Sequence, residues 1–484
     1  MEVGQLLLVV GAILAGSVIV ALGAARVGVP SLVAFLGLGM LLGSDGPGGI
    51  DFSDVEMART VGIVGLAAII YEGGLSTSWR QLRRVAPLGV LLATVGVAAT
   101  ALLTAPAAHV LLGLPWLQSV LLGAVVASTD AAAVFATLRY TAIRRHLAHI
   151  LEAETGLNDP VAIALTLGLI AWIEHPSGGA AHLALEVMRE LGLGLAVGAG
   201  FAAAAAWVFS RLPHSIGAFA PVASVAVAAL TFGTADVIHG SGFLAVYIVG
   251  LAIGSTPSRY RRQMVTFHQG LAFLAQVTLF VVLGLLVFPH DLGAVAAAGL
   301  ALAMLLVAVI RPLAVWIATA LSPCTSRERF LLGWAGLRGA GPIVLATFAL
   351  SAGVKRAETI FNAVFFVVVI STLLQGTTLE QLARRLRLVD DQPARTTAPL
   401  EIDLLGPLEL VEFDVSAAPA IAGSNVSDLG LPPKALIAVI TRGPDTIAPR
   451  GSTNIQPGDR LYILNPRAQH LELTDVFARW QQLI

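Results

Sequence analysis

The sequence predicts a polytopic α-helical membrane protein. We expect about thirteen transmembrane helices in two inverted six-helix repeats with crossed discontinuous helices, followed by a small cytoplasmic α+β domain. Hydrophobic residues make up 56% of the chain and charged residues only 12%, whereas a soluble domain carries about 25% charged residues. Apolar runs long enough to cross a bilayer recur as far as Arg387. Beyond that residue, apolar and polar residues alternate with the period of a β-strand.

The apolar runs, cut at their polar breaks, have roughly the 20 residues that a bilayer core requires. The first run begins close to Met1 and lacks the basic segment and cleavage site of a secretory signal, so we interpret it as a retained helix. The predicted spans are residues 5–25, 29–45, 61–79, 85–112, 116–138, 150–173, 183–210, 218–236, 241–256, 267–288, 292–320, 330–352 and 357–379.

The charges of the connecting loops predict the orientation. Alternate loops carry most of the arginines, and the loops between them carry acidic residues. Because cytoplasmic loops are enriched in Lys and Arg, we place the N-terminus outside and the tail in the cytoplasm of a multi-pass protein of the inner (plasma) membrane. The basic loops hold Arg80, Arg83, Arg84, Arg139, Arg144, Arg145, Arg211, Arg259, Arg261, Arg262, Arg327, Arg329, Arg384, Arg385 and Arg387.

The tail predicts a second domain. We assign residues 1–388 to the membrane domain, 389–403 to a linker and 404–484 to a cytoplasmic domain. Strand-like alternation covers 408–415, 436–441 and 461–464, with turn residues at 443–445 and 456–459. About 80 residues suffice for a small α+β domain.

Two polar segments interrupt the apolar spans. Ser128-Thr129-Asp130 lies inside one span, and Asn158-Asp159 lies inside the next. A carboxylate at bilayer depth costs several kcal/mol unless it faces a polar cavity, is paired or binds a cation. Residues 336–342, Gly-Leu-Arg-Gly-Ala-Gly-Pro, interrupt the corresponding span of the second half. Broken helices at matching positions of inverted halves indicate an ion site near the middle of the membrane.

These segments resemble the monovalent cation/proton antiporter superfamily, and within it the NhaP-like branch. The resemblance runs across nearly all of the predicted spans. One departure is Ala131, because the family usually has proline after this aspartate; we therefore expect a shorter helix break here. The matching segments are residues 122–130, 154–160 (Glu-Thr-Gly-Leu-Asn-Asp-Pro), 241–247 (Ser-Gly-Phe-Leu-Ala-Val-Tyr), 283–289 (Leu-Gly-Leu-Leu-Val-Phe-Pro) and 336–343.

The chemistry expected at the site is competition between a proton and an alkali cation. Asp159 supplies the charge, and a partly desolvated carboxylate titrates nearer neutral pH than an exposed one. Asn158, Thr129, Ser128 and Asp130 complete the predicted binding site, with the cation at Asp159 and Thr129. An alternative for Asp130 is that its side chain only caps the end of the broken helix.

Three other charged positions have structural interpretations. We expect Glu154 and Arg338 to form an ion pair, because either one alone would leave an unpaired charge in the bilayer. The resemblance implies the same pairing. Arg311 is expected to extend toward the membrane interface. Glu72 is expected at the cytoplasmic mouth, where it either attracts cations or is simply solvated.

Other function classes are disfavoured. No nucleotide-binding motif, catalytic triad or zinc-ligand spacing appears, so we expect a secondary transporter without a cofactor rather than an enzyme. A net charge of −1 argues against nucleic-acid partners.

The stoichiometry of exchange can also be predicted. Electrogenic relatives typically carry an aspartate where Asn158 stands and an intramembrane lysine. Here the only lysines are Lys355 and Lys434, so one proton should exchange for one cation.

The tail resembles the C-terminal subdomain of proteins that regulate potassium conductance (RCK-C or TrkA-C type), in residues 423–429 and 455–462. This resemblance implies a homodimer that binds a small, nucleotide-like ligand, or a dimerisation domain without ligand. We therefore expect K⁺/H⁺ exchange that serves pH homeostasis, with Na⁺ as an alternative or additional substrate. A regulated cation channel and a sodium-coupled solute symporter are the weaker alternatives, because neither a selectivity filter nor a second cation site is evident.

Overall fold

The computed structural model describes residues 3–27, 29–130, 143–176, 178–211, 219–256, 260–389, 399–400, 408–415, 421–443, 445–466 and 469–482. The chain divides into two compact units, Met1–Val389 and Asp390–Ile484, which are treated separately below. The second half of the predicted span 116–138, with Ala131 and Arg139, lies outside the described residues. So do Arg259 and most of the predicted linker.

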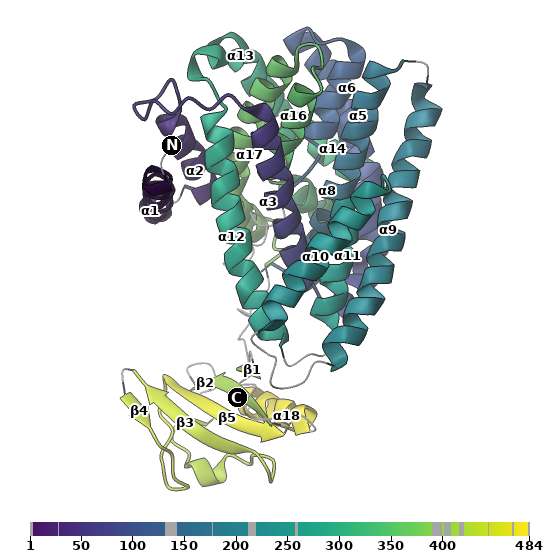
Figure 1. Cartoon of the computed structure of the whole chain (residues 1–484). Helices are drawn as coiled ribbons and strands as arrows, with labels where there is room; N and C mark the ends of the chain where they lie inside the picture. The colour runs from purple at the N-terminus through teal and green to yellow at the C-terminus, as the bar shows by residue number, and fades with distance from the viewer. Residues whose placement is uncertain are drawn as a thin grey trace. The chain divides into compact units, whose positions relative to one another are not determined.

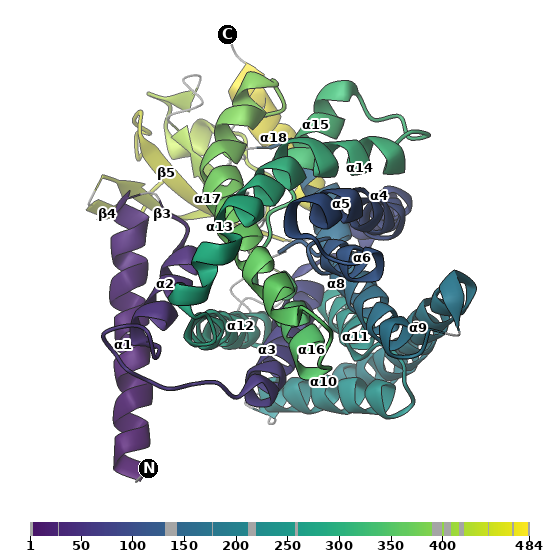
Figure 2. The same ribbon diagram turned by 90° about the horizontal axis from the view of Figure 1, so that it is seen from above.

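The first unit is all helical (Figures 1 and 2). Two short π-helical segments, Leu92–Gly96 and Leu306–Ile310, connect α4 to α5 and α13 to α14, so that each pair forms one continuous rod. The helices are α1 (Val3–Val27), α2 (Ser31–Leu42), α3 (Val55–Ser76), α4 (Trp79–Leu91), α5 (Val97–Leu112), α6 (Trp116–Val125), α8 (Arg145–Glu174), α9 (Gly179–Arg211), α10 (Ala220–Val237), α11 (Gly242–Ser255), α12 (Arg261–Leu285), α13 (Pro289–Leu305), α14 (Arg311–Ala318), α15 (Ser326–Trp334), α16 (Ala340–Ser351) and α17 (Ala357–Arg385).

The lengths of these helices support a membrane protein with many spans. Within the described residues, nine helical stretches are long and apolar enough to cross a bilayer. Four further apolar helices, α2, α6, α11 and α16, have 12, 10, 14 and 12 residues, fewer than the roughly 20 that a full span needs. The polytopic α-helical fold is confirmed, whereas the number thirteen stays a prediction.

Two groups of helices meet at the centre of this unit. In one group α3 packs against α11 and α12, and α11 also packs against α9. In the other, α6 packs against α5, α8 against α4, and α17 against α13 and α16. Contacts of α3 with α16 and α8, and of α12 with α16, join the groups. The view in Figure 2 looks down on this junction.

Both predicted helix breaks are present, and they cross. Helix α6 ends at Val125, and the described chain from residue 126 to 130 is not helical. On the other side, residues 335–339 separate α15 from α16, where clustered glycines and Pro342 disfavour a continuous helix. The main-chain N–H of Asp130 donates to the carbonyl of Leu337 at 2.8 Å. The prediction of crossed discontinuous helices is therefore confirmed.

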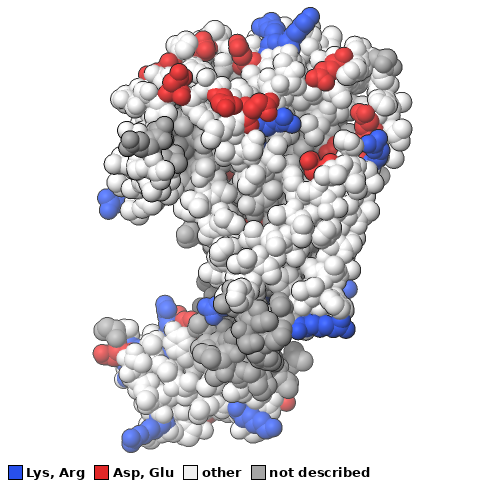
Figure 3. Space-filling view, in the orientation of Figure 1, with Lys and Arg blue, Asp and Glu red and all other residues white. Residues whose placement is uncertain are grey.

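Acidic side chains gather near one end of the membrane unit in the view of Figure 3, where α6 and α13 begin. The Arg144 guanidinium donates to the carbonyl of Arg387 at 3.4 Å. In Figure 3 basic side chains lie at the opposite end, and a few also lie at the acidic end. This separation agrees with the loop charges of the sequence. The assignment of the basic end to the cytoplasm remains a prediction.

In its described residues, the second unit is a five-stranded antiparallel sheet with the α-helix α18 and a short 3-10 helix, Val426–Asp428. Its strand order is β1-β2-β5-β3-β4, so the α+β prediction is confirmed. Its first strand falls inside the segment expected to be a linker. Gly458, at φ +89°, makes the turn before β5 that the sequence predicts, because positive φ favours glycine. The elements are β1 (Pro399–Leu400), β2 (Leu408–Asp414), β3 (Leu436–Arg442), β4 (Asp445–Ile447), β5 (Asp459–Pro466) and α18 (His470–Gln482).

Candidate functional site

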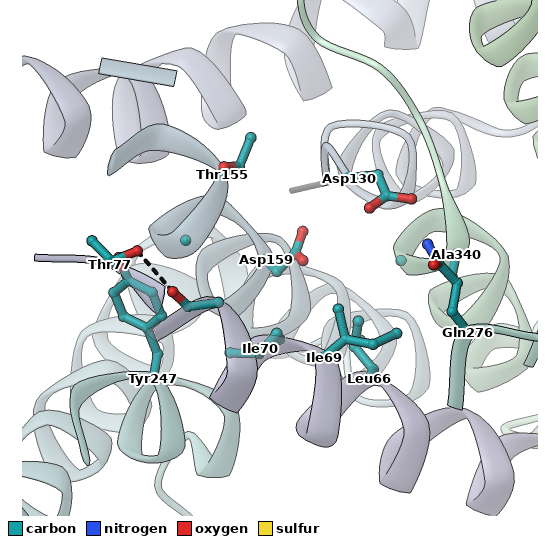
Figure 4. A pocket seen from close by; sticks show the side chains of 13 residues that line it. Leu66, Ile69, Ile70, Thr77, Asp130, Thr155, Asp159, Tyr247, Gln276 and Ala340 are labelled. Carbon is teal, nitrogen blue, oxygen red and sulfur yellow. Dashed lines mark hydrogen bonds between the residues drawn. The ribbon is translucent and has the colours of Figure 1, made fainter. Parts of the chain in front are cut away.

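A small cavity lies at the junction of the two helix groups. Its volume of about 20 Å³ holds one water molecule or one dehydrated ion, since a water needs roughly 10–15 Å³. Figure 4 shows the side chains around it. The lining residues are Leu66, Ile69, Ile70, Gly73, Thr77, Asp130, Thr155, Gly156, Asp159, Tyr247, Gln276, Ala340 and Gly341.

Asp159 lies near the middle of α8, where a carboxylate is far from bulk water on either side. Its side chain is only 6% exposed, and it points into the cavity (Figure 4). The Ser128 hydroxyl donates a hydrogen bond of 2.6 Å to its Oδ1. One carboxylate oxygen is thus held by the broken helix, which fixes the direction in which the group faces its ligand.

Asn158 and Thr129 lie beside this cavity and contact each other. The Asn158 amide donates to the Thr129 hydroxyl, and both side chains are fully buried. The Asn158 Oδ1 atom has no hydrogen-bond partner in the described part of the chain. Neither residue lines the cavity in this conformation. Their contact therefore attaches the non-helical segment to α8, and a cation at Thr129 stays a prediction.

The two crossed segments carry opposite charges at the ends of the broken helices. Arg338 donates to the carbonyls of Ala127 and Ser128 at 2.6 and 2.8 Å, where the carbonyl end of α6 carries partial negative charge. Asp130 lies against Gly339, the residue that precedes α16, where free N–H groups carry partial positive charge. Each charge therefore compensates a helix end.

The predicted ion pair between Glu154 and Arg338 is wrong. In the described part of the chain, Glu154 pairs with Arg311, and both side chains are 1% exposed. The π-helical segment Leu92–Gly96 packs against both α8 and α14, and this brings the pair together. The expectation that Arg311 extends to the membrane interface is also wrong, because its charge has a buried partner.

Glycines allow these close approaches. A Cβ atom added to Gly336 would lie 2.7 Å from Arg311 Nε, and one added to Gly339 would fall on the Asp130 carboxylate. An ordinary side chain at either position would force the neighbouring charged group to move. The glycines of the predicted break thus leave room for charged groups as well as interrupting a helix.

Several polar residues of the cavity were missed by sequence reasoning. Thr155, Thr77 and Tyr247 line the cavity from three helices, and Gln276 lines it from α12. The dashed line in Figure 4 is the bond of 2.7 Å that the Thr77 hydroxyl donates to the Gly73 carbonyl. Gln276 could have been found as an uncharged polar residue inside an apolar span.

The structure places Glu72 outside the lining of this cavity, and its carboxylate accepts a hydrogen bond of 2.6 Å from the Ser76 hydroxyl.

The arrangement is chemically simple. Two carboxylates, Asp159 and Asp130, share one small cavity with neutral oxygen groups, and no cluster suited to a transition metal occurs within the described residues. A hard alkali cation prefers oxygen ligands, and a proton can occupy the same carboxylate oxygen. The site can therefore bind either ligand in turn.

Comparisons with known proteins agree with this geometry. Residues 10–385 match the family described as "Sodium/hydrogen exchanger, transmembrane", and residues 410–478 match the TrkA-C domain. The K(+)/H(+) antiporter NhaP2 of Shewanella oneidensis is 35% identical over 479 residues, which cover 97% of this chain and 83% of that protein. The K(+)/H(+) antiporter NhaP of Alkalimonas amylolytica is 32% identical, covering 98% and 83%. Both resemblances read from the sequence are thereby confirmed.

Two further proteins are more distant. The Na(+)/H(+) antiporter ApNhaP of Aphanothece halophytica is 25% identical, over 73% of this chain and 70% of that protein. Among solved structures, the sodium proton antiporter MjNhaP1 from Methanocaldococcus jannaschii at pH 8 matches with a TM-score of 0.71 at 24% identity. That match covers 81% of this chain and all of the other, and it shows the shared fold.

Proposed function

The chain belongs to the sodium/hydrogen exchanger family of membrane transporters, and from this premise we propose that it exchanges cytoplasmic K⁺ for H⁺ at Asp159. Potassium is the first choice because the relatives of 32–35% identity over nearly the full chain are named K(+)/H(+) antiporters. Sodium is the second candidate, favoured by the relative named a Na(+)/H(+) antiporter.

The observation that carries the proposal is the place of Asp159. A carboxylate that is 6% exposed, faces a cavity of about 20 Å³ and accepts only one hydrogen bond from the described residues has room for one ligand. A proton and an alkali cation then exclude one another. If the empty carboxylate cannot cross the membrane, because its burial without a counter-charge is costly, every cycle moves one of each.

We propose one-for-one, electroneutral exchange. Asp130 and Arg338 compensate the ends of the crossed helices, and Glu154 is paired with Arg311. These three side chains are held in fixed contacts. Asp159 is therefore the carboxylate that exchanges a proton for a cation. Asn158 and Thr129 hold the non-helical segment in place, and Ser128 orients the carboxylate.

Reconstituted liposomes test this function. Purified protein should move protons when K⁺ is added, and the rate should not respond to an imposed membrane potential. An electrogenic cycle would respond, because one net charge is worth about 2.3 kcal/mol per 100 mV. Sodium should be tested as substrate with valinomycin and K⁺ setting the potential, and K⁺ with a lipophilic ion as clamp. A steady K⁺ conductance without a proton gradient would instead indicate a channel.

We further propose that the second unit regulates exchange. The TrkA-C match supports a homodimer whose second units bind a small, nucleotide-like ligand. The separation of loop charges supports an inner-membrane protein with its N-terminus outside and this unit in the cytoplasm, where it can respond to internal solutes. No organic cofactor is required for the exchange itself.

A further inference from the structure

Gln276 is a polar residue in the middle of an otherwise apolar stretch of α12, a helix of 25 residues. It lines the same cavity as Asp159 and Asp130. In Figure 4 its carboxamide reaches into the cavity region from the helix group that lacks both carboxylates. The amide therefore faces the proposed site from the opposite wall.

The amide of Gln276 has no hydrogen-bond partner within the described residues. Gln375 in α17 offers a useful contrast, because its amide donates to the Trp334 carbonyl at 2.8 Å and accepts from Ser371. Gln276 is half-buried, whereas Gln375 is fully buried. A polar side chain at membrane depth that has no hydrogen-bond partner in the protein is stabilised by water or by a ligand. The cavity is the source of such a partner open to Gln276.

We propose that the side-chain oxygen of Gln276 is a ligand of the alkali cation held at Asp159, and that it helps to select among alkali cations. This inference rests on the proposed function. The carboxylate supplies the charge, and the amide supplies a neutral oxygen with a weaker field. Selectivity between alkali cations depends on the number and field strength of such ligands. A neutral oxygen added from α12 thus changes the site without adding a group that titrates.

The placement also links the ligand to alternating access. Asp159 and Asp130 belong to one helix group, and Gln276 belongs to the other. Any movement of one group past the other changes the distance between the amide and the carboxylates. In the conformation described here, the amide and both carboxylates line one cavity.

The test replaces the amide in the full-length protein. Gln276→Leu should raise the KM for K⁺ about tenfold at an unchanged maximal rate, because one ligand of hydrogen-bond strength is lost. Gln276→Glu keeps an oxygen and adds charge, so its KM for K⁺ should not rise and its preference should shift toward Na⁺. Gln263→Leu is the matched control, because Gln263 is exposed near the start of the same helix. Its KM values should equal those of the wild type.

Thermal stability separates binding from folding. Because no protein hydrogen bond is lost, Gln276→Leu should melt at the wild-type temperature without cations, yet gain less stability from added K⁺. The stabilisation by K⁺ also reports cation binding in a variant that no longer transports. An unchanged KM and unchanged K⁺ stabilisation in Gln276→Leu would overturn the inference, and so would an equal rise in KM in the Leu and Glu variants. A wild type that exchanges no alkali cation for protons would instead overturn the proposed function.

Discussion

Asp159 is oriented by a single hydroxyl, that of Ser128 in the non-helical segment after α6, and the proposed exchange depends on whether its carboxylate can gain and lose a proton. Asp159→Asn should abolish exchange while the protein stays folded, because an amide can still accept the Ser128 hydrogen bond but can neither titrate nor attract a cation. Cation-dependent proton release from vesicles measures this. Asp130→Asn should be less severe, since Asp130 faces the end of α16. Full activity of Asp159→Asn would remove this residue from the transport site.

The buried pair of Glu154 and Arg311 gives a second prediction at the residue scale. Arg311→Ala should destabilise the protein by about 3–5 kcal/mol, because it leaves a buried carboxylate without its partner. The double variant Arg311→Met, Glu154→Leu should recover most of that stability, since apolar residues of similar size replace both charges. Thermal melting in detergent gives the comparison.

Arg338→Ala is the matched control for that experiment. Arg338 binds the carbonyl end of α6, so its loss should impair exchange more than folding. If Arg338→Ala melted at a much lower temperature than Arg311→Ala, the assignment of the pair to Arg311 would be contradicted.

At the scale of elements, the two non-helical segments must pass within contact distance. Gly339→Ala places a methyl group on the Asp130 carboxylate, and overpacking of this kind costs about 1–3 kcal/mol. We expect exchange to fall at least tenfold with modest loss of thermal stability. Gly293→Ala in α13, where an added Cβ has open space around it, should leave the rate unchanged.

A second prediction for an element concerns β5 of the second unit. Burial alone would raise the pKa of Asp459, but hydrogen bonds from Arg442 and from the Gln456 N–H outweigh it and hold the pKa below its ordinary value. The carboxylate therefore stabilises the fold above its unfolded pKa of 3.8, and this stability is lost as pH falls through the lower folded value. Asp459→Asn should cost about 1–3 kcal/mol near neutral pH.

Hydrogen exchange of peptides from β3 and β5 in the full-length protein measures that loss. The difference between wild type and Asp459→Asn should shrink when the pH falls below 3.8, because the wild-type carboxyl is then increasingly neutral. Asp445→Asn is the control, because Asp445 lies in the exposed β4. An equal effect of both substitutions would contradict the role given to Asp459.

At the scale of the whole molecule, the two units have separate hydrophobic cores. Truncation after Leu388 should therefore preserve basal exchange, because no buried charge of the membrane unit loses its partner. What should change is the dependence of the exchange rate on cytoplasmic pH or on a soluble nucleotide. Identical profiles for the truncated and full chains would leave dimerisation as the role of the second unit.

Much of this molecule follows from local properties of the sequence. Span length and hydropathy identify a polytopic membrane protein, and clustered glycines with a proline locate the helix breaks. A charged residue at bilayer depth is costly wherever its partners lie, so Asp159 and Asp130 are visible as site candidates without any structure. Period-two alternation likewise identifies β2, β3 and β5.

The identity of partners was decided only by the tertiary structure. Glu154 and Arg311 are 157 positions apart, and the sequence shows that a buried charge needs a partner without showing which of two arginines approaches it. Asn158 is held by Thr129, and Gln276 enters the cavity, because helices from different parts of the chain meet there. Hydropathy and spacing act along one segment, whereas pairing and lining depend on how helices pack against one another. The sequence thus determined the kind of protein and identified the carboxylate that we propose for the exchange, and packing determined the groups around that carboxylate.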